Sequence, residues 1–361
     1  MGGDHAPRVV VRGALDAARV HPEARLILVG REPIVREELQ AAGWQSSETP
    51  NLEVRHADNV IDMGDSPVEA LRKKKGSSIE VATRLVRSGE AVAMVSAGNT
   101  GACVAAATIL LGLLPEVRRA GIAVTFKAGE QPVVVIDMGA NVSSKPEHLI
   151  QYGIMASLYA RSVHGIENPR VGLLNIGEED EKGNSLTKTT HDLFQKTRLN
   201  YCRNVEGNQV FRGVADVIVC DGFVGNIVLK VSEGLAERLM ELFKHTFEGA
   251  LKDLAPIPVS SHDSAAVSSH DSAGGHPLGK LGEKLRATFG QLREKLDYSE
   301  YGGAPLLGVN GVMIIAHGRS DAKAIMNAIR VAKRMAVENV NKHITEEIRA
   351  LSEREGLSPA S

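Results

Sequence analysis

A chain of 361 residues with 43% hydrophobic residues can bury a sizeable core in one large or two modest domains, which excludes a disordered protein. A formal net charge of −2 excludes an overall basic surface of the kind that binds nucleic acid. Three cysteines without a C-x-x-C pair exclude a disulfide framework and a zinc knuckle, and they favour a reducing cytoplasm.

Short apolar runs alternate with segments of helical period along the first 222 residues. The runs cover 25–30, 91–96, 133–137, 170–177 and 216–222, and the helical segments cover 7–20, 31–43, 77–88, 146–164 and 184–196. Continuous rather than alternating hydrophobicity is typical of strands buried on both faces. The pattern therefore predicts a doubly wound α/β fold with a mostly parallel sheet, whose ligands bind beyond the carboxyl ends of the strands.

The chain from 223 to 299 has the pattern of a long helical hairpin. Apolar residues recur at steps of three or four from Ile227 to Leu254 and again from Leu281 to Leu296, which predicts two antiparallel helices that pack on a partner subunit or protrude. Their connection contains "SSHDSA" twice, so we expect a mobile tip at 255–277. Residues 1–222 and 300–355 then form the catalytic α/β core, with one long or broken amphipathic helix from about 321 to 355 over the sheet.

Neither a membrane-spanning helix nor a metal site is predicted. The longest apolar stretch, 102–114, is shorter than the roughly 20 residues that a spanning helix needs, and "MGGDHAP" lacks the basic and apolar start of a secretory signal. The hairpin tip contains side chains of types that bind metal ions: His262, Asp263, His270, Asp271 and His276. A metal site needs ligands held in fixed geometry, and the composition of the tip does not favour a fixed structure.

Gly-rich turns stand where strands are expected to end. They are "MGGDHAP" (1–7), "SAGNTGA" (96–102), "DMGAN" (137–141), "NIGEEDEKGN" (175–184), "DGFVGN" (221–226), and "YGGAPLLG" (301–308) followed by "AHG" (316–318). Each turn alone is explained by the positive φ that strand-to-helix connections require. Together they carry asparagines at positions 99, 141, 184 and 226, and several amide donors beside backbone N–H groups suit a phosphate or oxyanion better than a metal.

Several further side chains have both a functional and a structural interpretation. Lys182 supplies a positive charge to an anion or pairs with the four acidic residues beside it, and these alternatives stay equal. His317 is a general acid or a capped loop histidine, and Lys230 is a ligand or a solvent-facing residue; the structural interpretation is favoured for both. Cys103 follows a helix start, where a thiol can be activated, but it and Cys220 lie in apolar runs and are expected to be packed.

Taken together and in order, the turns resemble the motifs of one family. The segments "GGDHAP", "SAGNTGA", "DMGAN", "LNIGEEDEKGN", "NVEGNQVFRGVADVIVCDGFVGNIVLK" and "GGAPLLGVNGVMIIAHG" are similar to those of the PlsX family, the acyl-ACP:phosphate acyltransferases of bacterial phospholipid synthesis. The resemblance runs from residue 1 to about 340. It implies an enzyme that transfers a fatty acyl group from acyl carrier protein to inorganic phosphate. The acyl phosphate product then goes to a membrane-bound glycerol-3-phosphate acyltransferase.

The resemblance also implies a fold similar to those of the phosphate acetyltransferases and of the isocitrate and isopropylmalate dehydrogenases. It further implies a homodimer, no metal or other cofactor, no nucleic acid partner, and a cytoplasmic enzyme that associates peripherally with the membrane. A phosphate oxygen is already nucleophilic, so the protein need only hold phosphate against the thioester and stabilise the developing oxyanion. We therefore expect direct attack of bound phosphate on the thioester.

The expected site residues come from these turns. Phosphate is expected to be cradled, through backbone N–H groups and hydroxyls, by Ser96, Gly98, Asn99, Thr100 and Gly101. Lys182 neutralises the phosphate, Asn184 and Asn226 donate to phosphate or to the thioester oxygen, and His317 is a spare candidate for protonating the leaving thiolate. The residues that orient these donors or complete the binding turns are Asp4, Asp137, Asn141, Asp221, Gly222 and Gly225.

Two features depart from the family's pattern. The hairpin tip carries the Ser/His/Asp repeat where the family has an apolar tip that touches the membrane, which leaves "LAPIPV" (254–259) with Lys280, Lys284 and Arg286 for membrane contact. The family's first motif usually follows a short strand that ends in Asp, whereas this chain begins at Met1 of the motif. Either the sequence is trimmed or one strand is missing beside the site that Asp4 helps to form.

Three other functions remain as alternatives. The first is a phosphate acetyl- or butyryltransferase that uses a CoA thioester. The second is a hydride-transferring dehydrogenase, although the chain has neither G-x-x-x-x-G-K-[ST] nor a clean G-x-G-x-x-G with an acid about 20 residues on. The third is a scaffold without chemistry that docks carrier protein or membrane through the hairpin; the number of asparagines in the turns argues against it.

Overall fold

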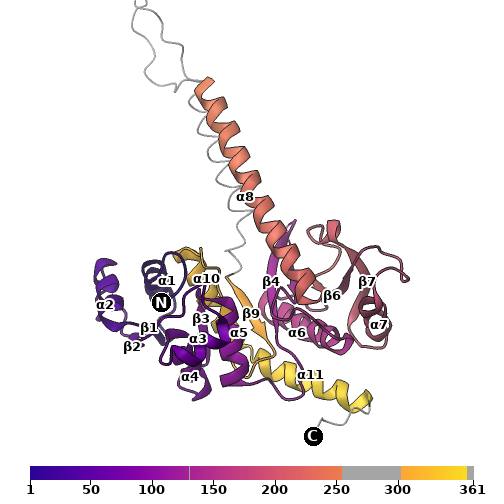
Figure 1. The fold of residues 1–361 in the computed structure, drawn as a ribbon, viewed down its shortest axis with the longest axis horizontal. Helices are drawn as coiled ribbons and strands as arrows, with labels where there is room; N and C mark the ends of the chain where they lie inside the picture. Colours follow the sequence, from indigo (N-terminus) through magenta and orange to yellow (C-terminus); the bar gives the residue numbers. More distant parts are fainter. Residues whose placement is uncertain (130, 254–301, 356–361) are drawn as a thin grey trace, which may run out of the picture. The chain divides into compact units, whose positions relative to one another are not determined.

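The structure is a computed structural model that describes residues 1–129, 131–253 and 302–355 (Figure 1). The chain forms two compact units, Met1–Val228 with Tyr298–Ser361, and Leu229–Asp297. Unit 1 contains the strands, and the described part of unit 2 is helical from Leu229 to Asp253. The predicted second helix of the hairpin and the tip at 255–277 lie outside the described residues.

Strands and helices alternate through unit 1. The strands are β1 (Leu26–Gly30), β2 (Leu52–His56), β3 (Ala93–Ser96), β4 (Gly121–Ala128), β5 (Gln131–Ile136), β6 (Arg170–Asn175), β7 (Asn200–Glu206), β8 (Val217–Val219), β9 (Ala304–Leu307) and β10 (Val312–Ile315). The helices are α1 (Arg8–Val20), α2 (Glu32–Ala41), α3 (Pro67–Lys73), α4 (Ser78–Arg87), α5 (Thr100–Ala106), α6 (Pro146–His164), α7 (Ser185–Phe194), α8 (Gly222–Asp253), α10 (Ala322–Val337) and α11 (Val340–Glu355). The five apolar runs of the sequence correspond to β1, β3, β5, β6 and β8.

The central sheet has eight strands in the order β3-β10-β9-β4-β5-β8-β6-β7, and β1 pairs with β2 in a separate two-stranded sheet. Four pairings of the large sheet are parallel, and three, all involving β9 or β4, are antiparallel. Helices cover the sheet: α10 packs on β3 and β10, and α6 packs on β5 and β8. The doubly wound α/β class is therefore confirmed, with an antiparallel middle that the sequence did not indicate.

The antiparallel strands reverse the direction of the sheet halfway across it. β4 returns into β5 through a hairpin in which Gly129 has a φ of 65°. As a result, β5, β8, β6 and β7 run opposite to β3 and β10. The strands of one parallel group, β3 and β10, therefore have their carboxyl ends on one side of the sheet, and those of the other group, β5, β8, β6 and β7, have theirs on the opposite side. The expectation that all the polar turns collect at one edge is wrong, because it assumed a single strand direction.

The core of unit 1 is centred on α6. This helix has Pro146 at its first position, where the missing N–H costs nothing, and it ends at Gly165, which has a φ of 73°. Its residues are buried on all sides because α6 packs on the sheet and also contacts α7, α10 and α11. Tyr152 and Tyr159 are fully buried there. This rigid layer supports the turns that follow β5 and β8.

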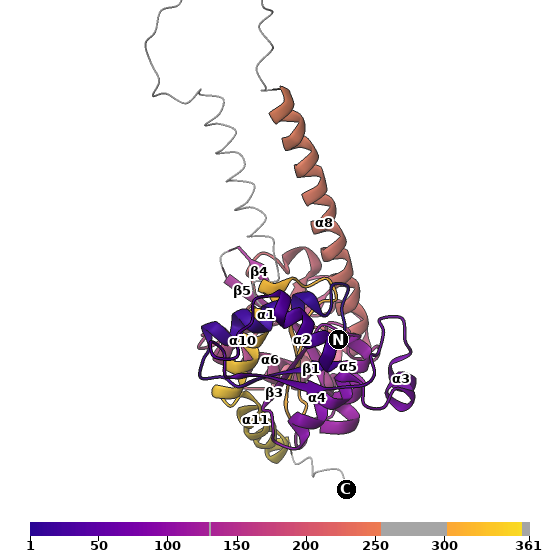
Figure 2. The same cartoon turned by 90° about the vertical axis from the view of Figure 1, so that its left-hand side faces the viewer.

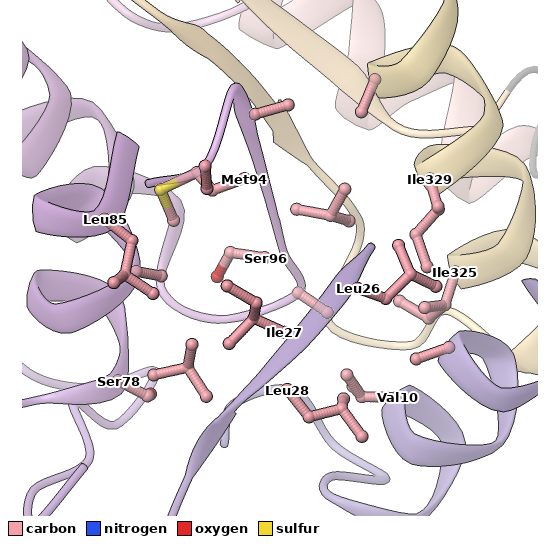
Figure 3. A pocket seen from close by; sticks show the side chains of 18 of the residues that line it. Val10, Leu26, Ile27, Leu28, Ser78, Leu85, Met94, Ser96, Ile325 and Ile329 are labelled. Atoms are coloured by element: carbon pink, nitrogen blue, oxygen red, sulfur yellow. The ribbon is translucent and has the colours of Figure 1, made fainter. Parts of the chain in front are cut away.

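A cavity of about 560 Å³ lies between β1 and β3 (Figure 3). In Figure 2 this end of unit 1 faces the viewer, with α1, α2 and β1. Among the described residues β1 pairs only with β2 and β3 pairs only with β10, so both strands turn a free backbone edge to the cavity. Met1 and Gly2 also line it.

The last helical segment is broken, as one of the two expected forms. Asn339, with a φ of 50°, separates α10 from α11. Along α8 the predicted apolar stripe is exposed: Val231, Leu235 and Leu242 are each more than half exposed. No helix in the described ranges is both long and apolar enough to cross a membrane.

Candidate active site

The reversed sheet separates the predicted site residues into two clusters. The β3 cluster contains Met1–Asp4, Ser96–Gly101 and Ala316–Gly318, which lie at the carboxyl ends of β3 and β10. The β8 cluster contains Asp137–Asn141, Asn175–Asn184 and Cys220–Asn226, which lie at the carboxyl ends of β5, β6 and β8. In the strand order of the sheet β3 is the first strand, and β6 is the last but one.

The β3 cluster is held by close approaches between backbones. The Asp4 amide donates to the Gly318 carbonyl at 2.8 Å. Gly2, with a φ of 152°, lies against Gly98 so closely that a Cβ on Gly2 would stand 2.8 Å from the Gly98 Cα. Glycine is required here because two chain segments cross without space for a side chain.

The side chain of Asn99 holds a neighbouring loop. It is buried, and its Nδ2 donates to the carbonyls of Asp62, Met63 and Asp65 at 3.1 to 3.2 Å. Its Oδ1 accepts from the Ala102 amide at 2.9 Å and so caps α5. Because both side-chain amide hydrogens are used by the protein, any contact of Asn99 with phosphate falls to its backbone N–H, and the predicted cradle stays a prediction.

Three other members of the β3 cluster also have local roles. The Ser96 Oγ accepts from the Gly98 amide at 3.2 Å. The Nδ1 of His317 accepts from the Arg319 amide at 3.1 Å, which agrees with a capped loop histidine. Gly101 packs on Pro67, where a Cβ would stand 2.5 Å from the proline ring. Thr100 is exposed at the first position of α5. Nothing places these residues beside Lys182 or Asn184 among the described contacts.

Asp137 organises the β8 cluster. Its carboxylate is fully buried, and Oδ1 accepts from the amides of Ile122, Gly139 and Ala140 at 2.9 to 3.1 Å. Oδ2 accepts from the backbone and side-chain nitrogens of Asn141 at 2.9 and 3.0 Å. Burial raises the pKa of the carboxyl, and the hydrogen bonds lower it. Five donors directed at one carboxylate determine the shape of the 137–141 loop.

Asn141 is also used by the protein. Its Nδ2 donates to the Ala120 carbonyl at 2.7 Å and lies 2.9 Å from the hydroxyl of Tyr152. Burial raises the pKa of Tyr152 far above its usual value, so the hydroxyl stays protonated. Asn141 therefore joins the loop to α6.

The start of α8 packs directly on this loop. A Cβ on Gly139, which has a φ of 121°, would stand 3.3 Å from the side chain of Asn226. Gly222 and Gly225 lie against the backbones of Asn141 and Asp137, with no space for a Cβ. These two glycines are therefore required by a close approach between helix and loop.

Asp221 caps α8. Its Oδ1 accepts from the amides of Phe223 and Val224, both at 3.0 Å. Capping of this kind satisfies two of the first N–H groups of a helix and leaves the positive end of the helix dipole at this edge of the sheet.

The acidic turn places Lys182 beside a second helix start. Asn175 Nδ2 donates to the Lys182 carbonyl at 3.1 Å, and Asn184 Oδ1 caps α7 by accepting from the Thr187 amide at 3.0 Å. Within the described part of the chain no ion pair of Lys182 is found, whereas Asp180 pairs with Arg203 at 2.8 Å. The exposed ammonium of Lys182 is therefore available to an anion. The sequence had left this question open.

A cavity of about 740 Å³ opens at the carboxyl ends of β6, β7 and β8, between the first turns of α7 and α8. Its exposed residues form the mouth and its buried residues form the inner wall. The mouth holds Ile176, Asn184, Gly207, Asn208 and Val224, and the inner wall holds Leu149, Leu173, Leu174 and Cys220. Both Asn184 and Asp221 line the cavity. Lys182 and Asn226 do not line it: Lys182 is two residues before Asn184 in the chain, and Asn226 is the fifth residue of α8.

Sequence reasoning missed part of this cavity. Glu206, the last residue of β7, and Asn208 line it, and outside the cavity Tyr152 of α6 supports Asn141. The turn "VEGN" at 205–208 is the signal that could have found the first two residues.

The cysteines do not supply a nucleophile. Cys103 and Cys220 are buried, and burial raises the pKa of Cys103 to about 11 and that of Cys220 well above its usual value. Among the described residues no group of three or more His, Cys, Asp or Glu side chains is arranged to hold a metal ion. The histidines and aspartates at 262–276 lie outside the described residues.

Comparisons with known proteins agree on one family. Residues 1–343 match a family model described as "Fatty acid synthesis protein". A phosphate acyltransferase from Desulfitobacterium hafniense is 44% identical over 350 residues, which cover 96% of each chain. A phosphate acyltransferase from Geotalea uraniireducens is 45% identical over 349 residues, which cover 96% of this chain and 92% of that protein.

Solved structures support the fold. A phosphotransacetylase from Streptococcus pyogenes superposes with a TM-score of 0.55 at 16% identity, over 91% of each chain. A phosphotransacetylase from Staphylococcus aureus superposes with a TM-score of 0.53, also at 16% identity, over 91% of this chain and 92% of that one. At this level of identity the likeness concerns the fold alone.

Proposed function

The chain belongs to the fatty acid synthesis protein family, the family of its phosphate acyltransferase relatives, and from that premise we propose that it transfers a fatty acyl group from acyl carrier protein to inorganic phosphate. Members of this family are acyltransferases of lipid synthesis. The observation that supports a site for the reaction is the cavity that has Asn184, Asp221 and two helix starts at its mouth and an apolar inner wall.

The reaction is a direct displacement. An oxygen of bound phosphate forms a bond to the thioester carbonyl carbon, and the carbonyl oxygen takes the negative charge of a tetrahedral intermediate. The carbon–sulfur bond then breaks, and the sulfur leaves with the electron pair as a thiolate, which takes a proton from solvent. Because the nucleophile carries its own charge, the protein contributes position and electrostatic stabilisation.

The β8 cluster provides these contributions. Lys182 balances the phosphate charge, and the Nδ2 of Asn184, whose Oδ1 is committed to capping α7, donates to phosphate or to the thioester oxygen. Asn226 provides a second amide at the start of α8. Asp137 and Asn141 hold the loop on which Asn226 rests, and Asp221, Gly222 and Gly225 position the helix start. The helix dipoles of α7 and α8 favour the anion at the same place.

The β3 cluster is given a supporting role. Asn99, Gly98 and Gly101 serve packing and capping there, Asp4 joins the first motif to Gly318, and His317 closes its own turn. We therefore assign phosphate binding to the β8 cluster. We assign protonation of the leaving thiolate to solvent rather than to His317. Ser96 and Thr100 stay candidates for a second phosphate contact.

The identity of the product tests this function. Acyl carrier protein loaded with a fatty acyl group and incubated with phosphate should yield acyl phosphate by mass spectrometry, and hydroxylamine should convert it to the hydroxamate. Acyl-CoA assayed in parallel should react more slowly. Faster turnover of acyl-CoA would instead assign the chain to CoA-dependent phosphate acyltransfer.

Direct attack has a separate test. Labelled holo-acyl carrier protein mixed with acyl-acyl carrier protein should not exchange acyl groups when phosphate is absent. Exchange without phosphate would demonstrate an acyl-enzyme intermediate and overturn direct attack.

The same proposal includes partners and location. The exposed apolar stripe of α8 in unit 2 suits a homodimer interface, since exposed patches of this kind mark interaction sites. We further propose that the protein is cytoplasmic, contacts the membrane peripherally and delivers its product to a membrane-bound glycerol-3-phosphate acyltransferase. Sedimentation of wild type and of a Leu235→Glu variant tests the dimer, and flotation with anionic vesicles tests membrane contact; a monomeric wild type or unbound protein would refute the respective part.

A further inference from the structure

We propose that the inner wall of the cavity at β6, β7 and β8 binds the hydrocarbon chain of the substrate, and that Val228 limits the chain length that fits. The inference rests on the proposed function, because it concerns the acyl group whose transfer is assigned to the mouth of the same cavity. It adds a chain-binding subsite and a residue that determines specificity.

The lining changes from polar to apolar with depth. Asn184 and Asn208 are exposed at the mouth, whereas Leu149 and Leu173 inside are 1% and 0% exposed. A thioester or acyl phosphate with a fatty chain has the same polarity, with a charged or polar head and an apolar tail. A volume of about 740 Å³ lies within the range of cavities that bind small organic ligands.

Val228 occupies the side wall where it can control the available depth. It is half-buried and lies one helical turn after Val224, on the face of α8 that lines the cavity. Residues four apart on a helix are neighbours on one face, so Val224 at the mouth and Val228 further inside form one continuous apolar surface of the wall. Ile227, adjacent in sequence, is 48% exposed and does not line the cavity.

The second apolar cavity, between β1 and β3, is a poor binding site for an alkyl chain. Its walls include the free backbone edges of β1 and β3, whose N–H and C=O groups need hydrogen-bonding partners. A hydrocarbon chain would desolvate these groups without pairing them, which is unfavourable. The members of the β3 cluster that line it are Met1, Gly2, Ser96, Ala97 and Gly98, and no residue of the β8 cluster lines it.

Alkylphosphonates of four to twelve carbons test the proposal without any turnover. Each buried methylene should tighten binding by about fourfold, so the dissociation constant should fall steadily with chain length until the cavity is filled and then level off. Val228→Phe should move this plateau to a chain at least two carbons shorter. Ile227→Phe is the matched control and should leave the profile unchanged, and thermal melting of both variants confirms that they are folded.

Three outcomes would overturn the proposal: no binding of any alkylphosphonate, affinity that is independent of chain length, or an identical profile in Val228→Phe. A plateau that shifts in Ile329→Phe instead would place the chain in the cavity between β1 and β3, which Ile329 lines. Failure of the proposed function is distinguishable, because loss of acyl phosphate formation with an intact alkylphosphonate profile would refute the reaction and not the subsite.

Discussion

Replacement of Lys182 by glutamine should slow the reaction through weaker binding and stabilisation of the phosphate. The side chain is exposed, and no ion pair in the described part of the chain competes for its charge. Two unit charges about 4 Å apart attract by ~1 kcal/mol in water and by ~4 kcal/mol near a protein surface. For an exposed lysine beside a cavity mouth we expect a loss of about 2 kcal/mol, which corresponds to a roughly thirtyfold decrease in kcat/KM for phosphate.

The assay is hydroxamate formation from acyl-acyl carrier protein over a range of phosphate concentrations. Lys188→Gln is the matched control, because Lys188 is an exposed lysine within α7, whereas Lys182 lies in the turn before the start of that helix. Lys182→Arg keeps the charge and should recover much of the activity. If Lys182→Gln has a kcat/KM within twofold of wild type and of Lys188→Gln, the charge of Lys182 does not act on phosphate and the reasoning is refuted.

Three other predictions concern stability and reactivity. Asp137→Asn turns an amide nitrogen toward at least two buried donors and should destabilise the fold by about 2–5 kcal/mol in urea melts; unchanged melting would show that the five hydrogen bonds are unimportant. Burial, with a nearby arginine, lowers the pKa of His164 from 6.5 to about 4. Between these two pH values the unfolded chain is protonated at His164 and the folded chain is not, so about 3 kcal/mol of stability should be lost as the pH falls from 6.5 to 4. His164→Gln should remove that part of the acid sensitivity, and an unaltered profile would contradict it. In a native thiol titration only Cys202, the half-buried cysteine, should react, because Cys103 and Cys220 are buried thiols of raised pKa; early modification of either would show that the core opens.

The sequence predicted the strands and helices well where burial is continuous. The runs ending at Gly30, Ser96 and Asp137 each contain a strand, and α6 has the predicted bounds. Such runs are recognisable because a strand covered on both faces needs an apolar residue at nearly every position. β9 and β10 escaped notice because they are four residues long and lie in a Gly-rich stretch.

The roles predicted for the site residues stay predictions. Asp137 and Asn141 hold the 137–141 loop, and Asn184 and Asp221 line one cavity, with Lys182 two residues before Asn184 in the chain. The phosphate cradle at 96–101 stays a prediction, but the side chain of Asn99 holds the protein together, and a local motif cannot reveal that distant carbonyls at 62–65 use both of its amide hydrogens.

The amino-acid sequence by itself determined the fold class, the family and the set of polar turns, because hydrophobic periodicity and turn chemistry are local properties of the chain. Only the tertiary structure decided which of these turns share an edge. Strand direction depends on pairing between segments far apart in sequence, and the antiparallel placement of β9, β4 and β5 reversed half of the sheet. That reversal, rather than any residue in the turns, places Asn99 and Lys182 after strands that run in opposite directions, and it is the reason that we propose the cavity beside α7 and α8 for the chemistry.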